Sequence, residues 1–227
     1  MSFRVDERAT DFREIDRFDG GVGWIAHPDE RMQRASHALE IDGEVWILDP
    51  VDAEGLDDLV AEFGDVAGVV VMLDRHRRDA AAIADRYGVH VYLPDFFEGV
   101  AEDLDAPIVR FGGELADTGL EARTVVDNRF WQEVSLYNPD DGTLVVPESV
   151  GTADYFRAGG ERLGVHPMRR FVPPRDALGD LSPERVLVAH GAGVMDDAAA
   201  ALADALSGSR KRTPRLYAEV GRDVLPF

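Results

Sequence analysis

The six residues at 68–73, Gly-Val-Val-Val-Met-Leu, form the apolar run that most constrains the fold of this chain. An uninterrupted apolar run of this length is typical of a β-strand that is buried on both faces. Residues 185–189, near the other end of the chain, predict another buried strand. Strands of this kind, mixed with helical patterns, place the chain in the α/β class.

The residues around the first run alternate between strand and helix patterns. The expected order is strand, hairpin, helix, strand, helix and strand, at residues 21–27, 37–49, 53–66, 68–73, 78–88 and 89–94. Asp42-Gly43 is a strong signal for a tight hairpin turn. Gly88 stands where a helix commonly ends.

The second half of the chain starts with strand patterns and ends with a helix. Residues 121–127, 131–137 and 143–149 predict strands, and residues 153–181 predict short helices and loops. Residues 182–208 predict a strand, a glycine-rich turn and an amphipathic helix. Residues 209–213 are interpreted as a solvated loop.

No shift in composition marks a linker between domains. We therefore expect a single domain over residues 1–227, in which residues 1–20 form an arm or an edge strand. No stretch reaches the ~18 consecutive apolar residues of a membrane helix, so we expect no membrane association. The absence of cysteine excludes disulfides and cysteine-ligated zinc.

Acidic residues dominate the charge of the chain. There are 44 acidic against 24 basic residues, Lys211 is the only lysine, and the net charge is −20. Such a balance argues against nucleic-acid binding, which needs a basic patch. The acids are spread along the whole chain, and we expect a cytoplasmic protein of a high-salt-adapted organism, because salt screens the repulsion among them.

Three predicted strands run into loops that carry side chains suited to chemistry. The run at 68–73 is followed by Asp74, Arg75, His76, Arg77 and Asp79; the strand after residue 143 is followed by Glu148; and the last strand is followed by His190. In open α/β sheets such loops collect at one edge, so these side chains are expected to converge.

The order of these motifs resembles the metallo-β-lactamase fold superfamily. The similar segments are "WILDP", "LDRHRRDA", "TLVVPES" and "VLVAHG", and they span roughly residues 20 to 207. The resemblance implies a four-layer αββα sandwich of two mixed β-sheets with outer helices. It also implies a metal-dependent hydrolase centre at the strand ends.

The residues at the motif positions depart from those of the superfamily. "LDRHRRDA" falls where the superfamily carries T-H-x-H-x-D-H, so Arg75 and Arg77 stand in place of two histidines, while Asp79 is kept. The bridging aspartate is replaced by Glu148, and the last histidine is kept as His190. A guanidinium has no lone pair for a metal. We therefore expect the usual two-metal centre to be absent, and His76, which is out of phase with the motif, to point away.

Two hypotheses for function follow from these departures, and neither assigns a catalytic residue. In the first, the metal centre is eroded and the chain is an anion-binding or interaction module without a cofactor. Its partner would be a small anionic ligand or a protein. Arg75, Arg77 and His76 are the candidate binding residues, and the arginines would either bind the anion or form ion pairs with Asp79 and Glu148. In this hypothesis, the glycine-rich turn at 191–193 opens a helix that favours anions.

In the alternative hypothesis, the chain is a hydrolase with one zinc or other divalent ion. The ion would be held by Asp79, Glu148 and His190, and an arginine would hold an anionic substrate. His166, in a proline-containing loop, is interpreted as a surface residue.

Overall fold

The larger of the two main sheets contains seven strands, in the same order in space as in the sequence. The computed structural model describes residues 2–224. The strands are β1 (Arg13–Phe18), β2 (Gly21–Ile25), β3 (Ala35–Ile41), β4 (Glu44–Leu48), β5 (Asp65–Val70), β6 (His90–Pro94) and β7 (Ile108–Phe111). The pairs from β1 to β4 are antiparallel and those from β4 to β7 are parallel, so the sheet is mixed.

The second sheet is smaller and is also mixed. Its spatial order is β13 (Arg185–Val188), β10 (Thr143–Val146), β9 (Trp131–Tyr137) and β8 (Glu121–Asn128). Only the β10–β13 pair is parallel. A short ribbon, β11 (Val150–Gly151) with β12 (Gly164–Val165), follows β10 in the chain.

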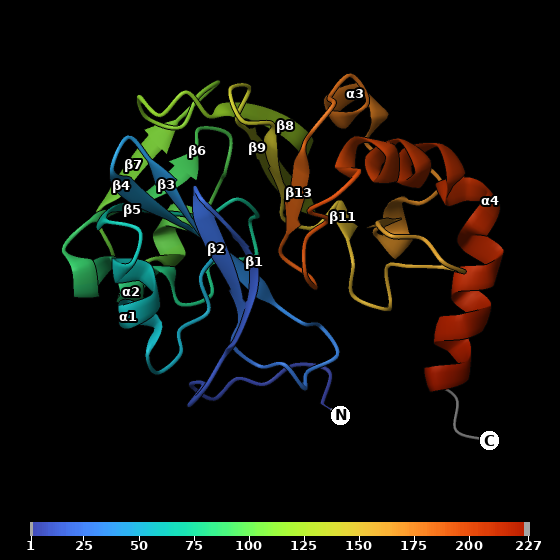
Figure 1. Ribbon diagram of the computed structural model, residues 1–227, viewed down its shortest axis with the longest axis horizontal. Coiled ribbons are helices and arrows are strands. Elements are labelled where there is room, and N and C mark those ends of the chain that lie inside the picture. The colour runs from blue at the N-terminus through green and yellow to red at the C-terminus, as the bar shows by residue number, and fades with distance from the viewer. Residues whose placement is uncertain (1, 225–227) are drawn as a thin grey trace.

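Helices cover the outer faces of the two sheets (Figure 1). On the side of the large sheet lie α1 (Leu56–Ala61) and α2 (Ala80–Tyr87), and on the other side lie α3 (Arg175–Leu178) and α4 (Ala198–Val224). Two 3-10 turns, Val100–Asp103 and Pro167–Arg169, complete the elements. The layers therefore run helix, sheet, sheet, helix, which confirms the predicted αββα sandwich.

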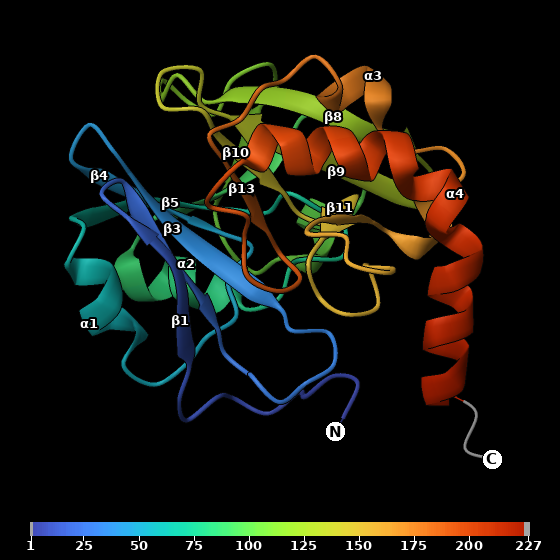
Figure 2. The same cartoon turned by 45° about the vertical axis from the view of Figure 1, so that its right-hand side comes forward.

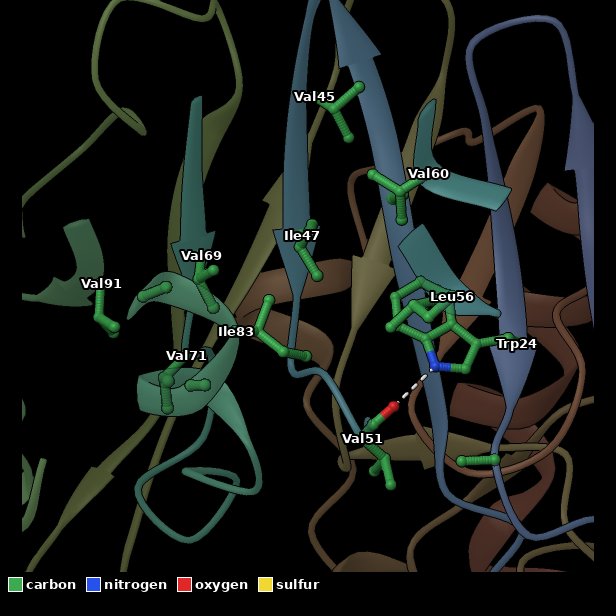
Figure 3. Close-up of a cluster of buried hydrophobic side chains, with 14 of the residues drawn as sticks. Trp24, Val45, Ile47, Val51, Leu56, Val60, Val69, Val71, Ile83 and Val91 are labelled. Carbon is green, nitrogen blue, oxygen red and sulfur yellow. Dashed lines mark hydrogen bonds between the residues drawn. The ribbon is translucent and has the colours of Figure 1, made fainter. Parts of the chain in front are cut away.

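Three hydrophobic clusters lie between these layers. One packs the large sheet against α1 and α2, and in it the Trp24 indole N–H donates to the Val51 carbonyl at 2.9 Å (Figure 3). A second packs the small sheet against α4. The third joins the inner faces of the two sheets through side chains such as Trp46, Met72 and Leu136.

Most predicted elements are present. Asp42 and Gly43 both adopt positive φ, 54° and 86°, in the turn between β3 and β4, as the hairpin signal requires. Gly88 ends α2 in the left-handed conformation. β1 is an edge strand, as expected for part of residues 1–20. Strand β7 was missed, because residues 108–111 give only a short apolar pattern.

The prediction of a loop at residues 209–213 is wrong. These residues lie inside α4, which Figure 2 shows as two stretches meeting at a bend. Ser209 and Thr213 are buried, and Arg212 pairs with the buried Glu161 at 3.1 Å. Gly208 and Pro214 are poor helix formers, but tertiary packing keeps the segment helical.

The helix after the last strand also begins later than expected. The glycine-rich turn at 191–193 does not open it, since α4 starts at Ala198. The prediction that this turn opens a helix is therefore wrong, and no helix amides lie at residues 191–193. Within residues 2–224, no helix combines the length and the apolar character that crossing a membrane requires.

Candidate metal centre

Loops from both sheets bring two histidines and a glutamate together. His76 follows β5, Glu148 follows β10 and His190 follows β13. One ligand atom from each of the three side chains lies within 4.8 Å of the other two, and all three residues are buried. Parallel pairing of β10 with β13 explains part of this arrangement, because the carboxyl ends of both strands reach the same edge.

His76 points into the site, so the expectation that it points away is wrong. The chain turns directly after the bridge at Leu73, where the His76 amide donates to the Leu73 carbonyl at 2.8 Å. This turn carries the ring inward, and its Nδ1 lies 2.8 Å from Oδ2 of Asp49, at the end of β4. When Asp49 is ionised its carboxylate can only accept, so Nδ1 of His76 carries the proton and the lone pair of His76 is on Nε2.

His190 is oriented in the same way by a backbone group. Its Nδ1 donates to the Met32 carbonyl at 2.9 Å, which leaves a lone pair on Nε2. That Nε2 atom is buried and has no hydrogen-bond partner among the described residues. Nε2 of His76 lies 3.8 Å from Oε2 of Glu148. A buried nitrogen lone pair without a hydrogen-bond partner, next to a carboxylate, is an arrangement that suits a bound cation.

Burial controls the protonation of this cluster. It lowers the pKa of both His76 and His190 well below the usual value, helped by Arg78, so both rings are neutral. Burial also raises the pKa of Glu148, while the nearby Arg75 works in the opposite direction. For Asp49, burial raises the pKa to about 7. Neutral imidazoles are the form that binds metal.

Arg78 was missed by the sequence reasoning. Its guanidinium donates to the carbonyls of Ala35 and Asp49, both at 2.6 Å, and to that of Ala189 at 3.2 Å. Nη2 of Arg78 lies 3.4 Å from Nε2 of His76, so a positive charge borders the cluster. Arg78 has a φ of 40°, a backbone conformation that its position among neighbouring basic residues in the sequence does not reveal.

The predicted arginines lie apart from each other. Arg75 pairs with Glu148 Oε2 at 3.1 Å and lies over the Trp131 ring at 4.5 Å. Arg77 turns to the surface and pairs with Asp103. The expected ion pair of an arginine with Glu148 is therefore present for Arg75 alone.

Asp79 is not part of the cluster. Its Oδ2 accepts the Asp52 amide at 2.8 Å, directly before α2. Of the three residues predicted as metal ligands, Glu148 and His190 come together, and His76 takes the third place.

Two further residues shape the site without having been predicted. Glu133 in β9 is fully buried and accepts hydrogen bonds from the Glu148 amide, the Ser149 amide and hydroxyl, and the Trp131 indole. His166 lies with Nε2 at 3.4 Å from Glu148 Oε1, so it is not a plain surface residue. The available signal for Glu133 was its place two residues after Trp131, which puts both side chains on one face of the strand. No signal in the sequence pointed to His166.

Comparison with known proteins identifies the fold. No family model and no curated protein matches the sequence. Among solved structures, DIM-1 metallo-β-lactamase exposed to ceftazidime is similar with a TM-score of 0.62 and 13% identity, over 92% of this chain and 99% of that one. The metallo-β-lactamase TMB-1 is similar with a TM-score of 0.55 and 14% identity, over 92% and 98%. Identities this low establish a shared fold and nothing more.

Proposed function

We propose that this chain, whose fold is that of the metallo-β-lactamases, is a hydrolase that uses one divalent metal ion held by His76, Glu148 and His190. The observation that carries the proposal is the buried Nε2 of His190, a lone pair without a partner that lies beside two other ligand atoms. Leaving such an acceptor unpaired costs about 1–3 kcal/mol, and a bound cation would remove that cost.

The donor set matches a catalytic rather than a structural metal site. Two imidazole nitrogens and one carboxylate are three protein ligands, which leaves a position open for water or substrate. Each imidazole is oriented through its other nitrogen, by Asp49 and by the Met32 carbonyl. Partners of this kind fix the tautomer and raise the basicity of a ligand.

The same residues support one ion rather than two. The Arg78 guanidinium, 3.4 Å from Nε2 of His76, has no lone pair to offer a second ion. Asp79, which aligns with the superfamily's aspartate, is engaged by the Asp52 amide. Among the residues that the structure describes, no second group of three ligands is present.

The surrounding side chains would hold the Glu148 carboxyl group in place, and Arg75 opposes the rise in its pKa that burial causes. Arg75 pairs with Oε2 of Glu148, and Nε2 of His166 lies near Oε1 of Glu148. Nδ1 of His166 accepts a hydrogen bond from the Met168 amide, so Nε2 carries the proton and donates to Glu148. Glu133 fixes the backbone at Glu148 and Ser149. When bound, a divalent ion supplies Lewis-acid activation of water or of a substrate oxygen.

A second candidate is the anion-binding or interaction module with an eroded metal centre. It is favoured by the Arg75–Glu148 ion pair and by the position of Arg78, which together add two cations to the site. In this candidate the arginines occupy the site in place of a metal and bind a small anion or a protein partner.

Metal analysis separates the two candidates. We expect the full-length protein, dialysed against zinc, manganese or iron(II) and then against buffer, to retain about one ion per chain. The His190→Ala variant should lose that ion, while His90→Ala, at an exposed position in β6, should keep it. A folded wild-type protein that retains none of the three metals would overturn the hydrolase proposal. Thermal melting of both variants confirms that they are folded.

We further infer that the protein works in a high-salt cytoplasm. The inference rests on the excess of 44 acidic over 24 basic residues. Many of the acids lie at exposed positions, where salt screens their repulsion.

A further inference from the structure

Basic residues are concentrated in two segments of the chain, although acidic residues dominate its total charge. Residues 155–175 and 209–217 together carry nine of the 24 basic residues and one of the 44 acidic residues. The two segments lie side by side, because the Tyr217 hydroxyl donates to the Pro167 carbonyl at 3.2 Å. The fold therefore gathers a local positive charge on a protein whose net charge is −20.

Three cations of these segments have no carboxylate partner among the residues that the structure describes. The Arg175 guanidinium donates to the Leu206 carbonyl at 2.8 Å, and Nε of Arg210 donates to a carbonyl at 2.6 Å, that of Phe171. Lys211 makes no ion pair with a described residue. All three cations are exposed. Their positive charges are therefore available to a partner of opposite charge.

Apolar side chains lie among these cations. Phe171, Val172 and Tyr217 are 59%, 70% and 50% exposed. Arg210 and Tyr217 are seven positions apart in α4, which places both on one face of the helix. Figure 2 shows α3, which begins at Arg175, beside the first stretch of α4. An exposed apolar cluster with a polar rim is typical of an interaction surface. We define the basic-apolar patch as Phe171, Val172, Arg175, Arg210, Lys211 and Tyr217.

We propose that the basic-apolar patch is a docking surface for a short acidic segment of a partner protein, in which apolar side chains stand between the carboxylates. The three cations of the patch complement the carboxylates, and its phenylalanine, valine and tyrosine contact the apolar residues. Tyrosine and arginine are enriched among the residues that carry binding energy at protein interfaces. The proposal goes beyond the proposed function, because the patch shares no residue with the metal cluster.

The distribution of charge favours a compact acidic segment over an extended polyanion. At physiological salt the Debye length is about 8 Å, so a ligand confined to the patch is acted on mainly by the local cations. A nucleic acid or an anionic membrane extends beyond the patch and would also meet the rest of the chain, which carries all but one of the 44 acidic residues. In addition, the aliphatic Val172 has no ring on which a nucleobase could stack.

Fluorescence anisotropy of the full-length protein with labelled short peptides tests the proposal. In the first peptide, pairs of glutamates alternate with phenylalanine or leucine. The second peptide has serine at the apolar positions, and the third has lysine in place of glutamate. We expect the first peptide to bind about ten-fold more tightly than either of the others, because only the first matches both the charge and the apolar side chains of the patch.

Two variants of exposed residues test the two halves of the patch. Lys211→Glu and Val172→Ser should each weaken binding of the first peptide about ten-fold and should melt as the wild type does. Arg13→Glu, at an exposed position in β1, makes the same change of charge as Lys211→Glu and should bind as the wild type does. Phe3→Ser removes an exposed ring outside the patch and is the control for Val172→Ser.

Equal binding of the three peptides, no measurable binding of the first, or wild-type affinity in the folded Lys211→Glu and Val172→Ser variants would each overturn the proposal. Tighter binding of single-stranded oligouridine or of phosphatidylglycerol vesicles than of the first peptide would also overturn it, because the patch would then serve a different class of partner. The titration needs no metal, so its outcome is independent of the metal analysis.

Discussion

Nδ1 of His76 lies 2.8 Å from Oδ2 of Asp49, and both side chains are more than nine-tenths buried. The aspartate ends one strand of the large sheet, and the histidine lies in the loop after the neighbouring strand. Asp49 also accepts the Met72 amide at 2.8 Å, so its carboxyl group is fixed on both sides. The orientation of the His76 ring is therefore set by the backbone of the large sheet.

Asp49→Asn should weaken metal binding by about 10–100-fold, the range for loss of a partner that orients a metal-binding histidine. The asparagine NH₂ group is a donor and cannot accept from Nδ1–H of His76 if its oxygen keeps the Met72 amide. Competition with a zinc chelator measures the change. Asp58→Asn, on the exposed face of α1, serves as the control. Unchanged affinity in Asp49→Asn would show that the ring is held by other contacts.

Arg78→Met should lower the free energy of unfolding by about 2–3 kcal/mol, because the carbonyls of Ala35, Asp49 and Ala189 each lose a hydrogen bond. Arg77→Met, one position earlier, removes a surface ion pair with Asp103 and should cost less than ~1 kcal/mol. Urea unfolding of the two metal-free variants gives both values. Similar losses would mean that the inward hydrogen bonds of Arg78 contribute little. In addition, zinc should bind Arg78→Met more tightly than the wild type, since a cation next to His76 is removed.

His166 should make the metal-free protein less stable in acid. Burial lowers its pKa to about 4, so between pH 6.5 and 4 the unfolded chain takes up a proton that the folded chain does not. The contribution of His166 to the free energy of unfolding is complete above about pH 6.5. As the pH drops below 6.5, this contribution decreases by up to about 1.4 kcal/mol per pH unit. Glu148, which faces His166, has a raised pKa and acts in the opposite direction. Arg75 and Arg169 also approach His166 and keep its pKa low.

Unfolding titrations at several pH values check this expectation. His166→Gln should give a flatter profile between pH 6.5 and 4 than the wild type. His90→Gln, at an exposed position in β6, should run parallel to the wild type. A parallel profile for His166→Gln would contradict the assigned cause.

Molar KCl should raise the melting temperature. With 44 acidic and 24 basic residues, the negative charges of the folded chain repel one another. Salt screens this repulsion, because the Debye length falls from ~10 Å at 0.1 M salt to ~3 Å at 1 M. Melting curves in dilute buffer and in KCl of increasing concentration measure the effect, with sucrose as a control for exclusion from the surface. A higher melting temperature in dilute buffer would rule out adaptation to salt.

The layered fold could be predicted because it depends on local patterns. Apolar runs, the Asp42-Gly43 turn and Gly88 each determine a nearby element, and the structure has them where the patterns place them. Helix α4 is longer than predicted, because its second stretch is kept helical by contacts with residues distant in sequence, such as Glu161 with Arg212.

The site was predicted only in part, for a physical reason. Glu148 and His190 lie at the ends of strands, where the residue position alone fixes the direction. His76 and Arg78 lie in an irregular turn, and one of them has a positive φ. In such a turn the side-chain direction depends on the tertiary contacts of the loop. Comparison of sequence motifs carries no information about these contacts.

The bond from His190 to the Met32 carbonyl joins residues that are 158 positions apart, and the neighbouring Arg34–His190 bridge reinforces it. Contacts of such long sequence separation slow folding, because closing the loop between them costs entropy. While the chain is being synthesised, His76 emerges from the ribosome long before its partner at 190 exists, and so the three ligands cannot meet until most of the polypeptide has been made. Under the proposed function, ion uptake would then follow the synthesis of residue 190.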